Sequence, residues 1–296
     1  MITGASGILG RAVHQEFKKY PYEIQAISNS RPNDERISLD LCKPKALDEA
    51  LNDLHPNVII HCAAERRPDV AEKDPDGSWH LNVKVPEQLA KWAKENGTWL
   101  IYISTDYVFW GDQAPYQVDA VTKPINLYGE SKLAGEKAVL GQSADFAVLR
   151  VPVLYTTSPE YLSEDPVSLV AENILNKGLG KHDHWSRRFP TNVADVAIVL
   201  EKLVRFYYDH HDMSGIWHYS GNERYTKYEM ALLMGEILDL DTSEYVPDDQ
   251  PPQGAPRPYD CKLDPQRLEK YFVLPQSIFK EQMTELLNPY KRGKSC

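Results

Sequence analysis

The stretch Thr3-Gly4-Ala5-Ser6-Gly7-Ile8-Leu9-Gly10 decides the fold of this chain. Three glycines at this spacing are typical of the turn that joins the first strand of a dinucleotide-binding unit to its first helix. Gly4 permits the tight turn, Gly7 lets the backbone approach a pyrophosphate, and Gly10 lets the helix pack closely on the sheet. The start of that helix offers unpaired N–H groups to the anion. Residues 3–10 therefore predict a phosphate-binding loop.

The strand before this loop is short in the sequence. Only Met1 and Ile2 precede Thr3, whereas a strand normally takes about five residues. Without upstream residues, the middle of the sheet lacks part of a strand. We therefore expect the first strand to be truncated here and the natural product to contain further residues upstream.

Downstream of the loop, short apolar runs alternate with helical patterns. Apolar stripes predict helices from Leu9 to Tyr20 and over residues 44–54. The run Val58-Ile59-Ile60-His61-Cys62 matches a parallel strand that is covered on both faces. The other predicted elements are strands at 24–28, 37–41, 99–104 and 147–151 and helices at 79–95 and 128–140. This alternation predicts an α/β fold with a doubly wound parallel sheet.

The regular alternation weakens after Leu154. We expect residues 1–154 to form a nucleotide-binding domain and residues 155–296 a smaller C-terminal lobe, with 190–222 returning to the first domain. Five prolines between Pro247 and Pro258 require an extended or irregular chain. The predicted elements of this half are helices at 169–175, 193–208, 226–238, 266–271 and 278–287 and a strand at 216–219.

Composition excludes several classes of function. The chain has 33 Lys plus Arg against 43 Asp plus Glu, a net charge of −10, which argues against nucleic acid as a partner because phosphate binding needs a basic surface. No run of about 18 apolar residues occurs, so no membrane-spanning helix is predicted. The four cysteines have neither metal-site nor disulfide spacing, which favours reduced thiols in a cytoplasmic protein without a metal.

The choice of cofactor depends on the segment Ser28-Asn29-Ser30-Arg31, at the end of the second predicted strand. Sites for NAD place an acid in this region to bind the ribose 2′-hydroxyl. Here Arg31 can pair bidentately with a 2′-phosphate while Ser30 donates to it. NADP is therefore the favoured cofactor. The alternative is that Asp34 or Glu35 takes the place of the acid and that Arg31 is solvated.

A Tyr-x-x-x-Lys pair follows at Tyr128 and Lys132. The spacing places phenol and ammonium on one helical face, where the lysine favours the phenolate and can hold a ribose hydroxyl. Such a tyrosine can exchange a proton with a carbonyl oxygen while nicotinamide transfers a hydride. Thr105, at the C-terminal end of a predicted strand, can donate to the same carbonyl. The predicted catalytic residues are Thr105, Tyr128 and Lys132.

Together these motifs resemble the extended short-chain dehydrogenase/reductase superfamily, which has the Rossmann fold. Residues 103–109 and 126–136 are similar to its dTDP-4-dehydrorhamnose reductase branch. Two subfamilies share these motifs, namely the sugar reductases and the regulatory β subunits of methionine adenosyltransferase. The resemblance to the second is closer and covers nearly the whole chain. It rests on residues 61–70, 184–191, 217–223 and 226–231.

The resemblance implies a regulatory subunit that binds NADP and the catalytic subunits of methionine adenosyltransferase and modulates S-adenosylmethionine synthesis. The alternative is an NADPH-dependent reductase of the dTDP-4-dehydrorhamnose type, because the catalytic trio is intact. Residues 65–69, Glu-Arg-Arg-Pro-Asp, replace a pattern of the reductases and favour the regulatory subunit with a vestigial trio. The NADP contacts implied by the resemblance are Ser6, Gly7, Ile8, Leu9, Arg31, Asp40, Leu41, Cys62, Arg66, Tyr128, Lys132 and Leu154.

Two departures from the family pattern stand out. The tail at residues 288–296 does not resemble the tail that the β subunits use to grip the catalytic subunits, so the mode of binding is expected to differ. Trp110 replaces the Asp that usually precedes Gly111, which alters the mouth of the expected pocket. A third reading, an NADP-dependent reductase acting on a different carbonyl, also stays open.

Overall fold

The computed structural model describes residues 1–29, 35–176 and 180–291. Within these residues, the core is a seven-stranded parallel sheet in the order β10-β6-β5-β4-β1-β2-β3. The strand that leads into the glycine-rich loop, β1, is therefore central. The strands are β1 Ile2–Thr3, β2 Ala26–Ser28, β3 Ile37–Ser38, β4 Val58–His61, β5 Trp99–Thr105, β6 Ala147–Val151 and β10 Gly215–His218.

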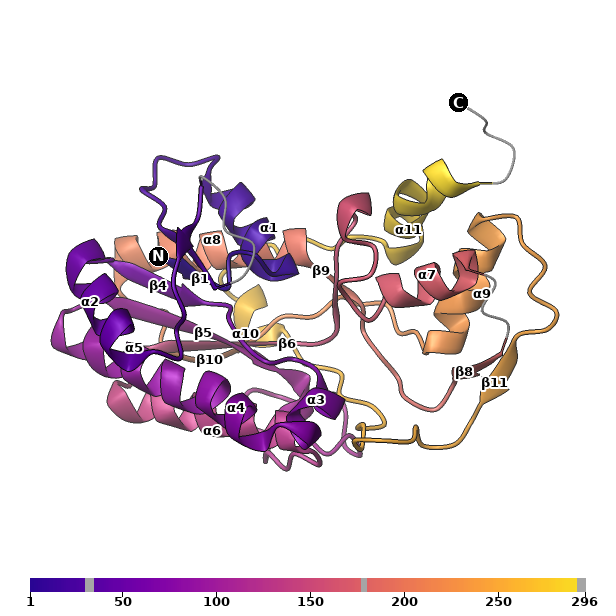
Figure 1. Cartoon of the computed structure of the whole chain (residues 1–296), viewed down its shortest axis with the longest axis horizontal. Coiled ribbons are helices and arrows are strands. Elements are labelled where there is room, and N and C mark those ends of the chain that lie inside the picture. Colours follow the sequence, from indigo (N-terminus) through magenta and orange to yellow (C-terminus); the bar gives the residue numbers. More distant parts are fainter. Residues whose placement is uncertain (30–34, 177–179, 292–296) are drawn as a thin grey trace.

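Helices cover both faces of this sheet (Figure 1). On one face α1 (Ile8–Phe17) packs against α8 (Val193–His210). On the other, α5 (Val85–Glu95) lies between α2 (Pro44–Leu54) and α6 (Leu127–Gln142) and packs against both. The chain thus winds to both sides of a parallel sheet, which confirms the predicted doubly wound α/β fold.

One predicted helix is interrupted in the structure. In place of a single helix at 79–95, the chain forms α4 (Pro75–Trp79), a π-helical turn at His80–Lys84 and then α5. The cause is Pro86, which lacks an N–H and whose ring would clash with the Asn82 carbonyl in a regular α-helix. That carbonyl instead accepts a hydrogen bond from the Tyr102 hydroxyl at 3.0 Å.

A second hydrophobic cluster lies beside the sheet. It is built by α7 (Ser168–Leu175), α9 (Lys227–Ile237) and α11 (Phe279–Leu287). After β6 the chain passes from the sheet to this second cluster. It returns to the sheet as α8 and β10 and then passes to the second cluster again. The short parallel pairs are β7 (Leu154–Tyr155) with β9 (Thr191–Asn192) and β8 (Lys181–Asp183) with β11 (Val246–Asp248). The remaining helices are α3 Pro68–Lys73, α10 Gln266–Glu269 and 3₁₀ turns at Asp106–Val108, Pro159–Tyr161 and Asn288–Tyr290.

Candidate functional site

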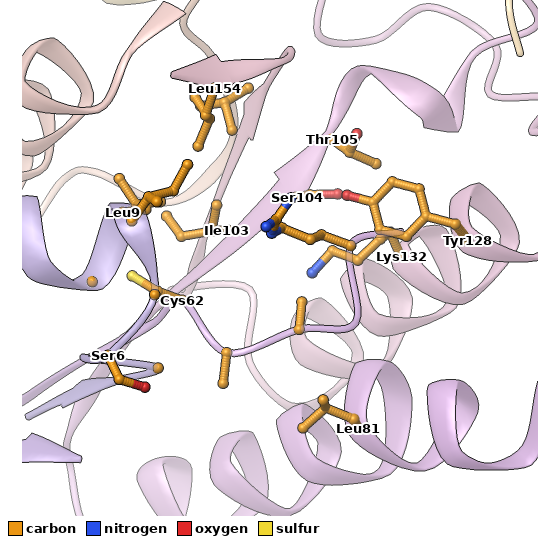
Figure 2. A pocket seen from close by; sticks show the side chains of 18 of the residues that line it. Ser6, Leu9, Cys62, Leu81, Ile103, Ser104, Thr105, Tyr128, Lys132 and Leu154 are labelled. Atoms are coloured by element: carbon orange, nitrogen blue, oxygen red, sulfur yellow. The ribbon is translucent and has the colours of Figure 1, made fainter. Parts of the chain in front are cut away.

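A cavity of about 430 Å³ lies at the C-terminal ends of the central strands. Figure 2 shows Ser6 toward one end of it, Thr105, Tyr128 and Lys132 toward the other, and Cys62 between them. The sequence-predicted residues that line it are Gly4, Ser6, Gly7, Ile8, Leu9, Gly10, Asp40, Leu41, Cys62, Arg66, Thr105, Tyr128, Lys132 and Leu154. Ser30 and Arg31, the predicted ligands of a 2′-phosphate, lie outside the described residues.

The glycine-rich loop is held by close backbone contacts. Gly4 has φ +66°, and a Cβ there would lie 2.7 Å from the backbone nitrogen of Ala63. A Cβ on Gly10 would lie 2.2 Å from the Gly4 carbonyl oxygen. Because these obstacles are backbone atoms, no side-chain rotation relieves them. The loop therefore keeps its N–H groups close to the cavity only with glycine at both positions.

The first turn of α6 carries Tyr128 into the cavity. The Asn126 side chain caps this helix by accepting a hydrogen bond from the Gly129 N–H at 2.8 Å. A Cβ on Gly129 would lie 2.3 Å from the Tyr107 carbonyl oxygen, so α6 packs directly against the 3₁₀ turn Asp106–Val108 that follows β5. The rings of Tyr107 and Tyr128 then meet edge to face at 5.8 Å. This local packing brings the phenol beside Thr105, as Figure 2 shows.

Thr105, Asp106 and Tyr128 form a hydroxyl-rich end of the cavity. The Thr105 hydroxyl donates to the Asp106 carboxyl at 3.0 Å and accepts from the Tyr107 N–H at 3.2 Å. Burial raises the pKa of Tyr128 well above its ordinary value, and a hydrogen bond with Thr105 offsets part of that rise. Burial also raises the pKa of Asp106 to about 7, so this carboxyl is about half protonated at neutral pH.

Lys132 follows Tyr128 by one helical turn, and its Nζ lies 4.0 Å from the centre of the Tyr102 ring. Burial lowers the pKa of Lys132 to about 7, while the Glu136 carboxylate acts in the opposite direction. The positive charge of Arg66 also acts on Tyr128 and lowers the pKa of its phenol. The effect of Lys132 on the phenol, which the sequence pattern predicts, stays a prediction.

Arg66 connects the cavity to two other segments. It donates a hydrogen bond to the Glu164 carbonyl oxygen, and the Glu164 carboxylate forms an ion pair with Arg11 at 2.6 Å. Arg11 also donates to the Ser6 carbonyl oxygen in the glycine-rich loop. The sequence analysis singled out neither Arg11 nor Glu164, because 153 residues separate them and neither belongs to a local motif.

Glu136, one helical turn after Lys132 on α6, forms a buried ion pair with Arg150. Arg150 donates to both carboxylate oxygens of Glu136, at 2.9 and 2.7 Å, and the Ser104 hydroxyl donates to the same carboxylate at 2.5 Å. Burial and the Arg150 charge lower the pKa of His218 to about 3, so its neutral ring lies 3.3 Å from Arg150 as an acceptor. These contacts hold β5, and with it Thr105, against α6.

The cavity also contains residues to which the sequence assigned no role. Ser104, Asp106 and Tyr107 are neighbours of Thr105 within residues 103–109, so their position at a strand end was the available signal. Asn29 follows strand β2, and Ala63 and Ala64 follow strand β4. Their positions just after predicted strands could have identified them as cavity residues. The additional lining residues are Ile27, Ser28, Asn29, Cys42, Ala63, Ala64, Pro68, Leu81, Ile103, Ser104, Asp106, Tyr107, Val151, Pro152, Val153 and Pro166.

Metal ligands and membrane spans are both missing from the described residues. Among residues 1–29, 35–176 and 180–291, no three His, Cys, Asp or Glu side chains are grouped so that they can hold a metal ion. In the same part of the chain, no helix is both long and apolar enough to cross a bilayer. Cys62 lines the cavity as a protonated thiol, because burial raises its pKa to about 12.

The chain matches known proteins over nearly its full length. The family model described as the RmlD substrate binding domain matches residues 1–292. Methionine adenosyltransferase 2 subunit beta of Xenopus tropicalis is 43% identical over 292 residues, which cover 98% of this chain and 87% of that protein. The dTDP-4-dehydrorhamnose reductase of Escherichia coli (strain K12) is 28% identical over 261 residues, 84% of this chain and 85% of that protein.

Solved structures share this fold. A hypothetical dTDP-4-dehydrorhamnose reductase from Sulfolobus tokodaii superposes with a TM-score of 0.82 at 26% identity and covers 95% of this chain and 97% of its own. The dTDP-4-dehydrorhamnose reductase from Bacillus anthracis, solved in complex with NADP, has a TM-score of 0.79 at 26% identity, with coverages of 97% and 96%. The chain therefore belongs to the RmlD substrate binding domain family of extended short-chain dehydrogenases/reductases and, within it, to the group of methionine adenosyltransferase 2 subunit beta.

Proposed function

We propose that this chain is an NADP-binding regulatory subunit of methionine adenosyltransferase that modulates S-adenosylmethionine synthesis. The observation that carries the proposal is the 43% identity to a β subunit over 98% of the chain, against 28% to a reductase over 84%. Its partner is then the catalytic subunit of that enzyme, because the related proteins are named as subunits of it.

The residues of the cavity fit a dinucleotide. The cradle of Gly4 and Gly10 leaves no room for side chains and presents the start of α1, which suits a pyrophosphate. Asp40 and Leu41 line the part that we assign to the adenine, and Tyr128 and Lys132 line the part that we assign to the nicotinamide ribose.

NADP is preferred to NAD for two reasons. The related Bacillus anthracis reductase was solved in complex with NADP. In addition, Ser28 and Asn29 at the end of β2 line the cavity and are neutral, whereas NAD sites carry an acid near this point. Ser30 and Arg31 follow this segment in the sequence, and we assign them as the ligands of the 2′-phosphate.

We also propose that the chain is divided into two parts. Residues 1–154 form the NADP-binding Rossmann domain, and residues 155–296 form a smaller C-terminal lobe whose segment 190–222 belongs with the sheet. The pairing of β10 with β6 and the packing of α8 on α1 support this assignment. Reduced thiols and the family assignment favour the cytoplasm as the place where the protein acts.

A second candidate function, reduction of a dTDP-4-dehydrorhamnose-type ketone, is favoured by one observation. Thr105 and Tyr128 lie beside each other at one end of the same cavity that contains the glycine-rich loop, as Figure 2 shows. In this reaction Tyr128 gives a proton to the carbonyl oxygen while NADPH supplies the hydride.

Two assays on one preparation distinguish these functions. We expect the chain to co-purify with the catalytic subunit of methionine adenosyltransferase. We also expect NADPH oxidation with a dTDP-4-keto-6-deoxy sugar to be no faster than in a Tyr128→Phe variant, which serves as the control. Turnover that depends on Tyr128, without formation of a complex, would reverse the choice in favour of the reductase.

Lys132 is expected to make NADP binding depend on pH. Because its pKa is lowered to about 7, the ammonium is mostly charged at pH 6 and mostly neutral at pH 8.5. Nucleotide hydroxyl and phosphate oxygens favour the charged form, so affinity falls as the pH rises through 7, by roughly three- to tenfold. Calorimetric titrations across this range measure the effect. A Lys132→Met variant should bind more weakly and lose this component, and an unchanged slope in that variant would refute the assignment.

A further inference from the structure

The segment at residues 156–165, between β7 and α7, is here called the strap. Its base is closed by Asp165, which is fully buried and accepts hydrogen bonds from the N–H groups of Val167 at 2.9 Å and Ser168 at 2.8 Å. The same carboxylate accepts from the Thr156 N–H at 3.4 Å, at the other end of the strap. Leu154, two residues before the strap, and Pro166, directly after it, line the cavity. The strap is therefore a closed loop anchored at the cavity wall.

Glu164 joins the strap to the glycine-rich loop. Its carboxylate pairs with Arg11, and Arg11 in turn donates to the Ser6 carbonyl oxygen. The two charged side chains are only 11% and 22% exposed, so solvent screens this pair less than it screens a surface ion pair. The contact links the strap to the start of α1, where we assign the pyrophosphate.

Glu164 also joins the strap to the opposite side of the cavity. Its backbone carbonyl accepts a hydrogen bond from Arg66, which lines the cavity and whose charge lowers the pKa of Tyr128. A guanidinium has five N–H donors, so Arg66 can hold the strap and a nucleotide oxygen at the same time. A bound nucleotide therefore reinforces the closed strap, because it adds a second partner to Arg66.

We propose that the strap is a latch that controls the exit of the nucleotide, with Glu164 as its fastening point. This inference rests on the proposed function, since it requires NADP in the cavity. The nucleotide leaves only after Glu164 releases Arg11 and Arg66, which makes exchange slow. A slowly exchanging nucleotide acts as a long-lived part of the subunit, whereas a reductase must release its NADP in every catalytic cycle.

The test is the rate at which NADPH dissociates from the full chain, followed by NADPH fluorescence in a stopped-flow chase with excess NADP. Glu164→Gln removes the charge but keeps the size, and we expect dissociation to be roughly tenfold faster, as for loss of one charge-assisted hydrogen bond. Glu160→Gln is the matched control, because Glu160 is an exposed acid on the same strap, and its rate should equal that of the wild type. Glu164→Asp retains the charge and should give an intermediate rate.

Three outcomes decide the question. Faster dissociation in Glu164→Gln alone, with an unchanged melting temperature of the nucleotide-free chain, supports the latch. Equal rates in Glu164→Gln and Glu160→Gln overturn the latch but leave the proposed function standing. If the wild-type chain binds neither NADPH nor NADP at saturating concentration, the proposed function fails and the latch fails with it.

Discussion

Gly10→Ala is expected to abolish measurable NADP binding and to lower the free energy of unfolding by about 3 kcal/mol or more. The new Cβ would lie 2.2 Å from the Gly4 carbonyl oxygen, 2.7 Å from the Gly4 carbonyl carbon and 2.8 Å from the Ala5 Cα. All three atoms belong to the backbone of the glycine-rich loop. Relief of the clash requires α1 to move away from the loop, which disturbs both the phosphate-binding turn and the packing of α1 on α8.

Urea unfolding and calorimetric titration with NADP measure the two effects. Gly141→Ala is the matched control, because Gly141 is an exposed helical glycine with nothing within 4 Å of its added Cβ. There the same substitution should be neutral or stabilise by about 0.5–1 kcal/mol, since alanine favours the helix. Wild-type stability and affinity in Gly10→Ala would mean that the loop does not have this geometry.

Arg150→Met should cost about 3–5 kcal/mol of stability, because it leaves the Glu136 carboxylate buried without its cation. Both side chains of the pair are almost fully buried, at 2% and 3% exposure. The variant also removes the hydrogen bond between Arg150 and the His218 ring. Thermal and chemical unfolding provide the measurement.

Two further variants make this prediction specific. Adding Glu136→Gln to Arg150→Met removes the unpaired charge, so the double variant should recover part of the lost stability. Lys84→Met breaks the exposed Lys84–Glu87 pair, 3.0 Å long, and should cost less than about 1 kcal/mol. If Arg150→Met were no more damaging than Lys84→Met, the buried pair would contribute nothing particular to the fold.

The elements that could be predicted from the sequence are those with an unbroken local pattern. The stripe at Pro44–Leu54 and the apolar run at Ala147–Val151 form a helix and a strand over the residues that were predicted. The helix at 79–95 was not fully predictable, because its π-helical turn depends on Pro86 and on a contact with Tyr102 from another element. The pairs β7–β9 and β8–β11 are too short to carry a pattern, and only packing around the second cluster places them.

The candidate site also contains a part that could be predicted from the sequence and a part that could not. The glycine-rich loop and the Tyr128–Lys132 pair could be predicted because the residues of each motif lie within ten positions of one another. The parallel sheet then brings both motifs to one edge, so their meeting in one cavity follows from the fold. The contact between Arg66 and Glu164 could not be predicted, since it joins segments 98 residues apart through a hydrogen bond to a backbone carbonyl oxygen that belongs to no local motif.

The return of α8 and β10 to the sheet has a mechanical consequence. Because the chain passes from the sheet to the second cluster and back, neither half of the molecule is one continuous piece of polypeptide. A single proteolytic nick in residues 156–165 would leave two interleaved fragments that still share a core. A fragment that stops at Tyr155 would instead lack β10 and expose the open edge of β6, which invites other chains to pair with it. This architecture thus tolerates a broken backbone far better than a missing half.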